Sequence, residues 1–450
     1  MFFIGVGGAG LSAIARLMVQ QGITVAGSDA ADSAVLAALR AEGITCHVGH
    51  DAAHLAGVDT VIASTAVHDD NPEIVEAVRR GLRLWPRSAG LRSVMQGRRT
   101  IAVAGTHGKT TTSAMLSCAL IAAGAAPSYA IGAEVASLGA NARLGAGDLL
   151  VAEADESDGA FLVYEPEGAI VTNVEADHLD NYGTAEAYAA AFDEFIGNIG
   201  DFVVLNSDDD GAAALAARAR QRGLDVVLAG FGEDAGLRGH ALVVEGSVTT
   251  FTVSHHGVDL GQVRLAVPGA HYAVDALLAL GAGIVLGQNV DLLIAGLAAY
   301  TGADRRMQLL GAAGGVRVYD SYAHHPTEIR ADLAAARAIA GTDRLVVAYQ
   351  SHLVSRTKIY GAEMGRELSA ADRVFLADIY LAREVADPAV TPRLIADAVT
   401  GPEVTVAGPV ATLAAALLPE LHPGDLLLTL GAGDITKVGP EVLAALEARA

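Results

Sequence analysis

A glycine-rich stretch carries one of the few lysines in the chain. Only three of the 30 basic residues are lysines, namely Lys109, Lys358 and Lys437. Lys109 lies in a stretch that follows an apolar run and precedes a helical pattern. The stretch consists of Gly105, Thr106, His107, Gly108, Lys109, Thr110 and Thr111. Backbone amides, an ammonium and a hydroxyl at a helix N-terminus can bind ATP phosphates and supply one magnesium ligand. We therefore predict an ATP-binding loop, although Val103 occupies the position of the first glycine in the usual pattern.

Two polar segments further along the chain each follow a run typical of a buried strand. The acidic segment Glu153–Asp158 comes directly after Leu149–Ala152, and Asn173–His178 follows the next such run. The carboxyl ends of parallel strands meet at one edge of a sheet, where carboxylates could hold Mg²⁺ directly or through water. A solvated acidic loop and a surface histidine at position 178 are the alternatives.

A second glycine turn lies at the N-terminus. Gly5, Gly7 and Gly10 match the G-x-G-x-x-G spacing between a strand and a helix, and Asp29 lies about 20 residues further on. Glycines permit a tight turn and close approach of the backbone, with the helix N-terminus facing a diphosphate. Taken alone, the pattern fits a nucleotide, a dinucleotide or merely a tight turn between a strand and a helix.

The elements that must position these residues alternate between strand and helix patterns. Strand-and-turn segments at Met1–Gly10, Thr100–Thr112 and Val316–Glu328 are followed by helical patterns at Leu11–Gln21, Ser113–Ala123 and Ile329–Ala340. Such alternation predicts an α/β fold with parallel sheets. A length of 450 residues suggests three domains. Polar stretches near residues 97 and 302 place the domains at 1–97, 98–302 and 303–450.

Composition excludes several classes of protein. The net charge of −22, with 52% hydrophobic and 18% charged residues, indicates a globular chain and disfavours a nucleic-acid binder. The most apolar stretches are shorter than the roughly 20 residues that a membrane span needs. No secretory signal is apparent, and Cys46 and Cys118 suit a reducing compartment, so we expect a cytoplasmic protein. A monomer and a homodimer are both compatible with the sequence.

Taken in order, these motifs resemble those of the Mur ligases, the ATP-dependent amide ligases of peptidoglycan synthesis. The resemblance runs from about residue 2 to about residue 437. It is carried by GVGGAG at 5–10, GSD at 27–29, DNPE at 70–73, GTHGKTTT at 105–112, EADESD at 153–158, TNVEADHLD at 172–180, PGAH at 268–271, DSYAHHPTE at 320–328, the segment 350–357 and GAGDI at 431–435.

The resemblance implies a three-domain enzyme with an N-terminal Rossmann-like domain, a central P-loop ATPase-like domain and a C-terminal Rossmann-like domain. It further implies that ATP and Mg²⁺ are used to join L-alanine to the carboxylate of UDP-N-acetylmuramate through an acyl phosphate. The histidine in GTHGKT is shared with a cousin that recycles a tripeptide onto the same sugar nucleotide. Ser157 and Glu328 favour the alanine ligase, and the recycling ligase is the alternative.

The resemblance also implies roles for individual residues. Lys109, His107, His324 and Arg356 would be catalytic, with His107 near the muramoyl carboxylate, and Thr110, Glu153 and His178 would bind Mg²⁺. The UDP-sugar would contact Gly7, Gly8, Ala9, Gly10, Asp29 and Ser64. Arg305 and Asp320 would reach the ATP from the domain junction. L-alanine would contact Tyr322, His324, His352 and Arg356.

The chain departs from the family pattern at several positions near these motifs. The family usually has a second acidic residue at the position of Ser321 and a proline at the position of Ser351. Leu353, Tyr272 and Asp275 also replace more usual residues. These departures motivate a rival reading as a catalytically lapsed nucleotide-binding protein. A nicotinamide-dependent oxidoreductase that uses the first glycine turn is a further rival, but it leaves Lys109 and the acidic segments unexplained.

Overall fold

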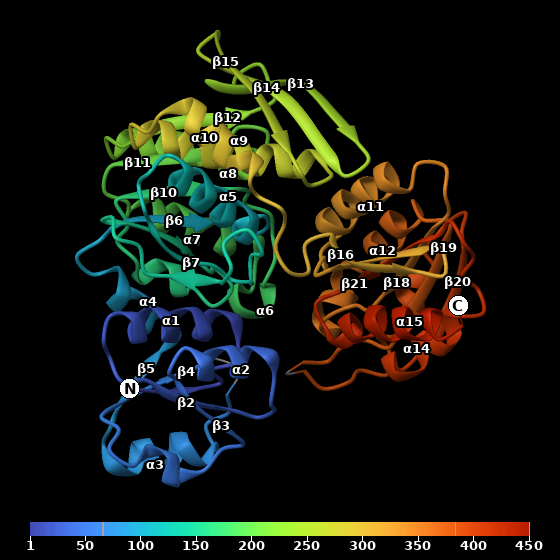
Figure 1. The fold of residues 1–450 in the computed structure, drawn as a ribbon, viewed down its shortest axis with the longest axis horizontal. Helices are drawn as coiled ribbons and strands as arrows, with labels where there is room; N and C mark the ends of the chain where they lie inside the picture. The colour runs from blue at the N-terminus through green and yellow to red at the C-terminus, as the bar shows by residue number, and fades with distance from the viewer. Residues whose placement is uncertain (65–66, 383, 450) are drawn as a thin grey trace. The chain divides into compact units, whose positions relative to one another are not determined.

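The computed structural model describes residues 1–64, 67–382 and 384–449, which form three β-sheets flanked by helices (Figure 1). The chain divides into two compact units. Unit 1 comprises Met1–His240, Thr252–Val263 and Val274–Tyr300, and unit 2 comprises Ala241–Phe251, Arg264–Ala273 and Thr301–Ala450. The boundaries predicted near residues 97 and 302 therefore stay predictions, because the first sheet and most of the second sheet share one unit.

The first sheet is parallel, with strand order β3-β2-β1-β4-β5. Its elements are β1 (Phe2–Ile4), α1 (Ala9–Gln20), β2 (Ala26–Asp29), α2 (Ala34–Ala41), β3 (Thr45–Val48), the 3-10 helix η1 (Ala52–Leu55), β4 (Thr60–Ala63), α3 (Pro72–Arg80), β5 (Arg83–Pro86) and α4 (Arg87–Met95). Side chains alternate across the strands. Phe3 therefore packs with α1, α2 and α4, whereas Phe2 and Ile4 pack with η1 and α3.

The second sheet has ten strands in the order β15-β14-β13-β12-β11-β10-β6-β9-β7-β8. Its strands are β6 (Arg99–Ala104), β7 (Ser128–Ala130), β8 (Ala142–Arg143), β9 (Leu149–Glu153), β10 (Gly168–Val171), β11 (Phe202–Asn206), β12 (Asp225–Gly230), β13 (Leu237–Glu245), β14 (Val248–His255) and β15 (Val258–Leu265). Its helices are α5 (Lys109–Ala122), η2 (Ala160–Val163), α6 (Leu179–Tyr182), α7 (Ala185–Ile196), α8 (Asp210–Gln221), α9 (Ala270–Val285) and α10 (Val290–Ala298). The strands β9 and β10 flank β6, which places the ends of all three at one edge of the sheet.

One contiguous core extends from the first sheet into the second, and a polar contact reinforces it. Arg16 of α1 is buried, and its guanidinium donates to Glu42 at 2.9 Å, to Glu134 at 2.5 Å and also to Asn141. Burial alone would lower the pKa of Arg16, but the carboxylates of Glu134 and Glu42 raise it above its usual value. The apolar core and these contacts explain why the first sheet and most of the second sheet belong to one compact unit.

The third sheet lies in unit 2 and has the order β16-β17-β21-β18-β19-β20. Its elements are β16 (Gln308–Ala313), β17 (Val316–Ser321), α11 (Pro326–Ala340), β18 (Leu345–Tyr349), α12 (Val354–Leu368), β19 (Arg373–Ala377), α13 (Arg393–Ala396), β20 (Glu403–Gly408), α14 (Val410–Leu417), β21 (Leu426–Leu430), η3 (Asp434–Lys437) and α15 (Val438–Glu447). Among the described strands of this sheet, β16 alone pairs in antiparallel fashion. The helices α11 and α12 cover one face, and α14 and α15 cover the other (Figure 1).

The alternation of strand and helix patterns predicted this α/β architecture correctly. All three predicted helices begin earlier than their apolar periodicity indicated, and the helix expected from Ile329 begins at Pro326. The helix expected from Ser113 begins at Lys109, because the Thr112 amide already donates to the Gly108 carbonyl at 2.9 Å. The helix expected from Leu11 likewise begins at Ala9. Within the described residues, the structure contains no helix with the length and apolar character of a membrane span.

Candidate functional site

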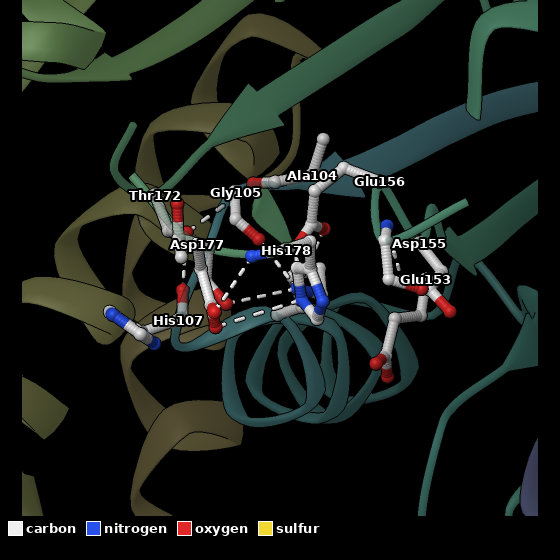
Figure 2. Close-up of polar contacts among 12 residues, drawn as sticks. Ala104, Gly105, His107, Glu153, Asp155, Glu156, Thr172, Asp177 and His178 are labelled. Atoms are coloured by element: carbon white, nitrogen blue, oxygen red, sulfur yellow. Dashed lines mark hydrogen bonds and ion pairs between the residues drawn. The ribbon is translucent and has the colours of Figure 1, made fainter. Parts of the chain in front are cut away.

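The ATP-binding loop predicted at residues 105–111 joins β6 to α5 at the edge where β9 and β10 also end (Figure 2). Two of its glycines have left-handed backbones, with φ of 134° at Gly105 and 80° at Gly108. A Cβ at Gly105 would lie 2.0 Å from the Thr172 hydroxyl, and one at Gly108 would lie 2.6 Å from the Asp275 carboxylate. Backbone conformation and close packing therefore both require glycine in this loop.

The ammonium of Lys109 lies inside this loop, and its side chain is only 13% exposed. It donates to the carbonyls of Gly105 at 2.6 Å and Thr106 at 3.0 Å, and it lies 2.7 Å from Oε2 of the fully buried Glu156. Burial alone would lower the pKa of Lys109, but the carboxylates of Glu156 and Asp155 raise it above its usual value. The lysine is therefore held as a cation where a phosphate would contact the loop.

The three predicted magnesium ligands lie near the start of α5, but they do not all touch one another. The Thr110 hydroxyl donates to Glu153 Oε1 at 3.2 Å, and Glu153 Oε2 accepts from the Gly132 amide at 2.7 Å. Nε2 of His178 instead lies 3.7 Å from Glu156 Oε1 and 3.7 Å from Asp177 Oδ2. Carboxylate and hydroxyl oxygens are ligands that Mg²⁺ prefers. The donor set of Thr110 and Glu153 therefore fits this ion.

Polar groups that follow β10 hold the loop from its other side (Figure 2). The His107 amide donates to the Asn173 side chain at 2.8 Å, and the His107 carbonyl accepts from the Thr172 hydroxyl. Nε2 of His107 lies 3.3 Å from a carboxylate oxygen of Glu175. The Thr106 hydroxyl contacts the Tyr188 hydroxyl at 2.8 Å. Tyr188 lies on α7, and no sequence motif indicated its contact with the loop.

The first glycine turn lines a cavity of about 600 Å³. Gly5, Gly7, Gly8, Asp29 and Ser64 line it, and all of these except Gly5 are residues predicted to contact the UDP-sugar. The Gly7 amide donates to Asp29 Oδ2 at 2.9 Å, and a Cβ at Gly7 would lie 2.9 Å from the same oxygen. Of the other two residues predicted for the UDP-sugar, Ala9 begins α1 and Gly10 follows it. Glycine thus brings the carboxylate of Asp29 against the backbone of the turn.

A second cavity, of about 190 Å³, connects the beginning of α1 with the edge of the second sheet. Gly10 lines one part of it, and Gly132, Glu153 and Asp155 line another. Arg87 also lines this cavity, and its guanidinium lies 2.8 Å from Asp155. Burial opposes ionisation of Asp155, yet the positive charges of Arg87 and Lys109 hold its pKa well below the usual range. No sequence motif indicated that Arg87 would line a cavity together with Glu153.

The residues predicted to reach ATP from the C-terminal region form one cluster in unit 2. Arg305 donates to Asp320 at 3.1 Å and also to the Gly431 carbonyl. Asp320 accepts hydrogen bonds from the hydroxyls of Thr429 at 2.6 Å and Thr436 at 2.9 Å. The carboxylate of Asp320 is therefore fixed by three donors at the end of β17.

The four residues predicted to bind L-alanine form a continuous series of contacts in unit 2. The ring of Tyr322 packs edge-on against His324 at 5.3 Å between centroids, and His324 contacts the His352 ring at 5.9 Å. Nη1 of the buried Arg356 lies 3.2 Å from Nδ1 of His352. The guanidinium of Arg305 lies 5.0 Å from the Tyr322 ring centroid, a cation–π distance. The structure thus brings this predicted group together.

Each departure from the family pattern has a defined place in the structure. The Ser351 hydroxyl contacts Thr357 at 2.5 Å, and Leu353 has a positive φ of 71° immediately before α12. The Tyr272 hydroxyl donates to the Arg306 carbonyl at 3.0 Å. Asp275 accepts a hydrogen bond from the Thr112 hydroxyl at 3.1 Å, so it contacts the first turn of α5, directly after the ATP-binding loop.

Family comparisons cover nearly the whole chain. Residues 2–99 match the Mur ligase family catalytic domain, residues 103–283 match the Mur ligase middle domain, and residues 305–433 match the Mur ligase glutamate ligase domain. The chain is 57% identical over 449 residues to a UDP-N-acetylmuramate–L-alanine ligase of a Nocardioides species, which covers 99% of this chain and 96% of the relative. It is 50% identical over 454 residues to the ligase of that name from Kineococcus radiotolerans, with the same two coverages.

Solved structures give the same picture of the fold. The crystal structure of a UDP-N-acetylmuramate–alanine ligase from Thermotoga maritima superposes with a TM-score of 0.85 at 28% identity, and the match covers 100% of this chain and 99% of that one. A murein peptide ligase from Psychrobacter arcticus superposes with a TM-score of 0.75 at 24% identity, covering 99% and 98% of the two chains. The predicted three-domain α/β architecture is thereby confirmed.

Proposed function

This chain belongs to the Mur ligase family, and from that premise we infer that it joins L-alanine to the carboxylate of UDP-N-acetylmuramate in peptidoglycan synthesis. The high identity to alanine ligases along the full length supports this assignment. Clustering of Tyr322, His324, His352 and Arg356 supports an amino-acid site. We place the enzyme in the cytoplasm, since its two cysteines are free and suit a reducing compartment.

The reaction requires activation of a carboxylate. A carboxylate does not condense with an amine in water because its oxygen is a poor leaving group. Transfer of the γ-phosphoryl group of ATP to the muramoyl carboxylate gives an acyl phosphate and ADP. The amine of L-alanine then attacks the acyl carbon, and phosphate leaves from the tetrahedral intermediate to give the amide.

Lys109 is the residue to which we assign stabilisation of the transferring phosphoryl group. Its ammonium would exchange the carbonyls of Gly105 and Thr106 for phosphate oxygens, with the loop amides as further donors. Thr110, Glu153 and His178 would hold Mg²⁺, which neutralises charge on the phosphate oxygens when bound. His107, which lies on the same loop as Lys109 and whose amide donates to Asn173 beyond β10, would lie near the muramoyl carboxylate.

The two cavities of unit 1 suit a long anionic substrate. The larger cavity, at Gly5, Gly7 and Gly8, would take the UDP moiety on amides at the beginning of α1. The smaller cavity, which extends from Gly10 to Glu153, would take the sugar and lead its carboxylate towards the ATP-binding loop. The guanidinium of Arg87 would provide positive charge along this route.

L-alanine would bind in unit 2. The planar guanidinium of Arg356 can pair with the alanine carboxylate through two hydrogen bonds, and His352 beside it would orient that pair. Tyr322 and His324 would face the amine or the acyl phosphate. Arg305 and Asp320 would contact the nucleotide from the same unit.

The single observation that carries the proposal is the combination of the Lys109 loop with full-length identity to alanine ligases. The test measures phosphate release with ATP, Mg²⁺, UDP-N-acetylmuramate and a panel of amino acids and the tripeptide. We expect turnover to depend on L-alanine, and Arg356→Ala should raise the KM for L-alanine about tenfold without changing the KM for ATP. Turnover with the tripeptide alone would replace this assignment with the recycling ligase.

A further inference from the structure

A buried contact fixes the segment that carries Asp320, Tyr322 and His324. Ser321, 1% exposed at the end of β17, donates its hydroxyl hydrogen bond to Oδ2 of Asp332 on α11. The same hydroxyl oxygen accepts from the Ala323 amide at 3.3 Å. Ser321 therefore ties the turn that begins at its own position to the side chain of Asp332.

A second carboxylate of α11 holds the other end of this segment. Glu328, one helical turn before Asp332, accepts from the His324 amide at 3.0 Å and the His325 amide at 3.3 Å. Residues four apart lie on one face of a helix. The two carboxylates therefore act as a pair on one helix face, which we call the α11 carboxylate pair. Tyr322 lies between Ser321, which contacts Asp332, and His324, whose amide donates to Glu328.

The position of Asp332 is costly for a carboxylate. Asp332 is buried, its Oδ1 lies 3.9 Å from Nε2 of His271, and the charges of Glu328 and Arg306 act on it. Burial raises the pKa of Asp332 to about 7; the hydrogen bond from Ser321 opposes this effect and Glu328 adds to it. An apolar residue would serve packing better than a buried acid in such surroundings. A carboxylate here therefore calls for an explanation other than packing.

We propose that Asp332 is a positioning residue for the amino-acid site, acting through Ser321 to set the turn that presents Tyr322 and His324. Ser321 stands where the family usually has a second acid, so in this chain the helix supplies the carboxylate and the strand supplies the hydroxyl. Asp332 itself need not touch the substrate. The proposal rests on the proposed function, because the amino acid is what Tyr322 and His324 would contact.

The test uses four variants of the full-length enzyme: Asp332→Ser, Ser321→Ala, Ser321→Asp and the exchange Ser321→Asp/Asp332→Ser. The first two break the contact, the third places two carboxylates together, and the exchange restores one carboxylate and one hydroxyl with their sides reversed. Arg330→Ala on the same helix is the matched control, since that side chain is 61% exposed. The measured quantities are kcat, the KM values for L-alanine, ATP and UDP-N-acetylmuramate, and the melting temperature.

We expect each single variant to raise the KM for L-alanine about tenfold while the KM for ATP changes less than about twofold, and the exchange to recover to within about threefold of wild type. A folded Asp332→Ser or Ser321→Ala with an unchanged KM for L-alanine would overturn the proposal. So would an exchange variant no better than the worse single variant. If Asp332→Ser does not fold, Ser321→Ala, which leaves the helix intact, decides the question alone.

Failure of the proposed function has a different signature. If the wild-type enzyme turns over with the tripeptide and not with L-alanine, the substrate assignment is wrong. The same comparison of KM values is then made with the tripeptide. A selective rise in that KM on breaking the contact would support the role of Asp332, and no selective rise would refute it.

Discussion

The two glycine turns of unit 1 share a backbone plan and differ in their side chains. Each follows a parallel strand and has a glycine with positive φ, 83° at Gly5 and 134° at Gly105, and each precedes a helix whose N-cap is glycine. In the first turn, a carboxylate, Asp29, accepts from the Gly7 amide. In the second, a cation, Lys109, lies within the loop. In both cases the turn supplies backbone amides, whereas the side chains on and beside the turn determine which chemistry it can perform.

Removal of the cation from the second turn should have the largest effect. Lys109→Ala removes the charge that we assign to the phosphoryl group, so kcat should fall by about 1,000-fold or more while the fold persists. Phosphate release and circular dichroism would measure the two quantities. The exposed lysines give matched controls, and Lys358→Ala and Lys437→Ala should retain activity within about twofold. Residual activity of Lys109→Ala within about tenfold of wild type would contradict the assignment.

A methyl group added to each turn should separate the two nucleotide sites. Gly105→Ala should lower kcat/KM for ATP by about 100-fold, because its Cβ would lie 2.0 Å from Thr172 Oγ1 and φ is unfavourable. Gly7→Ala meets the movable side chains of Asp29 and Leu36. It should raise the KM for UDP-N-acetylmuramate about tenfold and spare the KM for ATP. If both variants changed the KM for ATP equally, the assignment of one turn to ATP and the other to UDP-N-acetylmuramate would be wrong.

The carboxylate of the first turn should have a moderate effect. Asp29→Ala frees the Gly7 amide and removes a polar wall of the larger cavity. We expect a several-fold rise in the KM for UDP-N-acetylmuramate and an unchanged KM for ATP. Steady-state kinetics with each substrate varied in turn would measure both. An effect on ATP alone would show that this turn does not serve the sugar nucleotide.

The ion pair between Arg87 and Asp155, at the smaller cavity, should make the smallest contribution. Because the pKa of Asp155 lies below its unfolded value, its carboxylate stabilises the fold above about pH 4 and loses that contribution as the pH falls further. Asp155→Asn should therefore cost about 1 kcal/mol, since both side chains are partly exposed. Denaturant unfolding should give a constant difference between pH 8 and pH 5 that shrinks below about pH 4. A difference that already declines between pH 8 and pH 6 would point to another group.

Local sequence was sufficient to predict the α/β fold, the second glycine turn and the position of the acidic segment Glu153–Asp158 at the end of a neighbouring strand. Each depends on a strand pattern, a nearby turn and the rule that parallel strands end at one edge. The ion pairs of Lys109 with Glu156 and of Arg87 with Asp155 join residues that are 47 and 68 positions apart, respectively. They depend on how β9 and its following loop pack against other elements, which no periodicity encodes. The contact of Ser321 with Asp332 joins residues only 11 positions apart, but it depends on how α11 packs against the end of β17, which periodicity does not encode either.

The central claim is that the muramoyl carboxylate is activated by phosphoryl transfer at the Lys109 loop before L-alanine attacks. The most direct measurement uses UDP-N-acetylmuramate with both carboxylate oxygens replaced by ¹⁸O, and mass spectrometry of the products after turnover with L-alanine. Phosphoryl transfer to the carboxylate should leave one labelled oxygen in each released phosphate and one in the new amide. Unlabelled phosphate together with an amide product would contradict the acyl phosphate and, with it, the role assigned to Lys109.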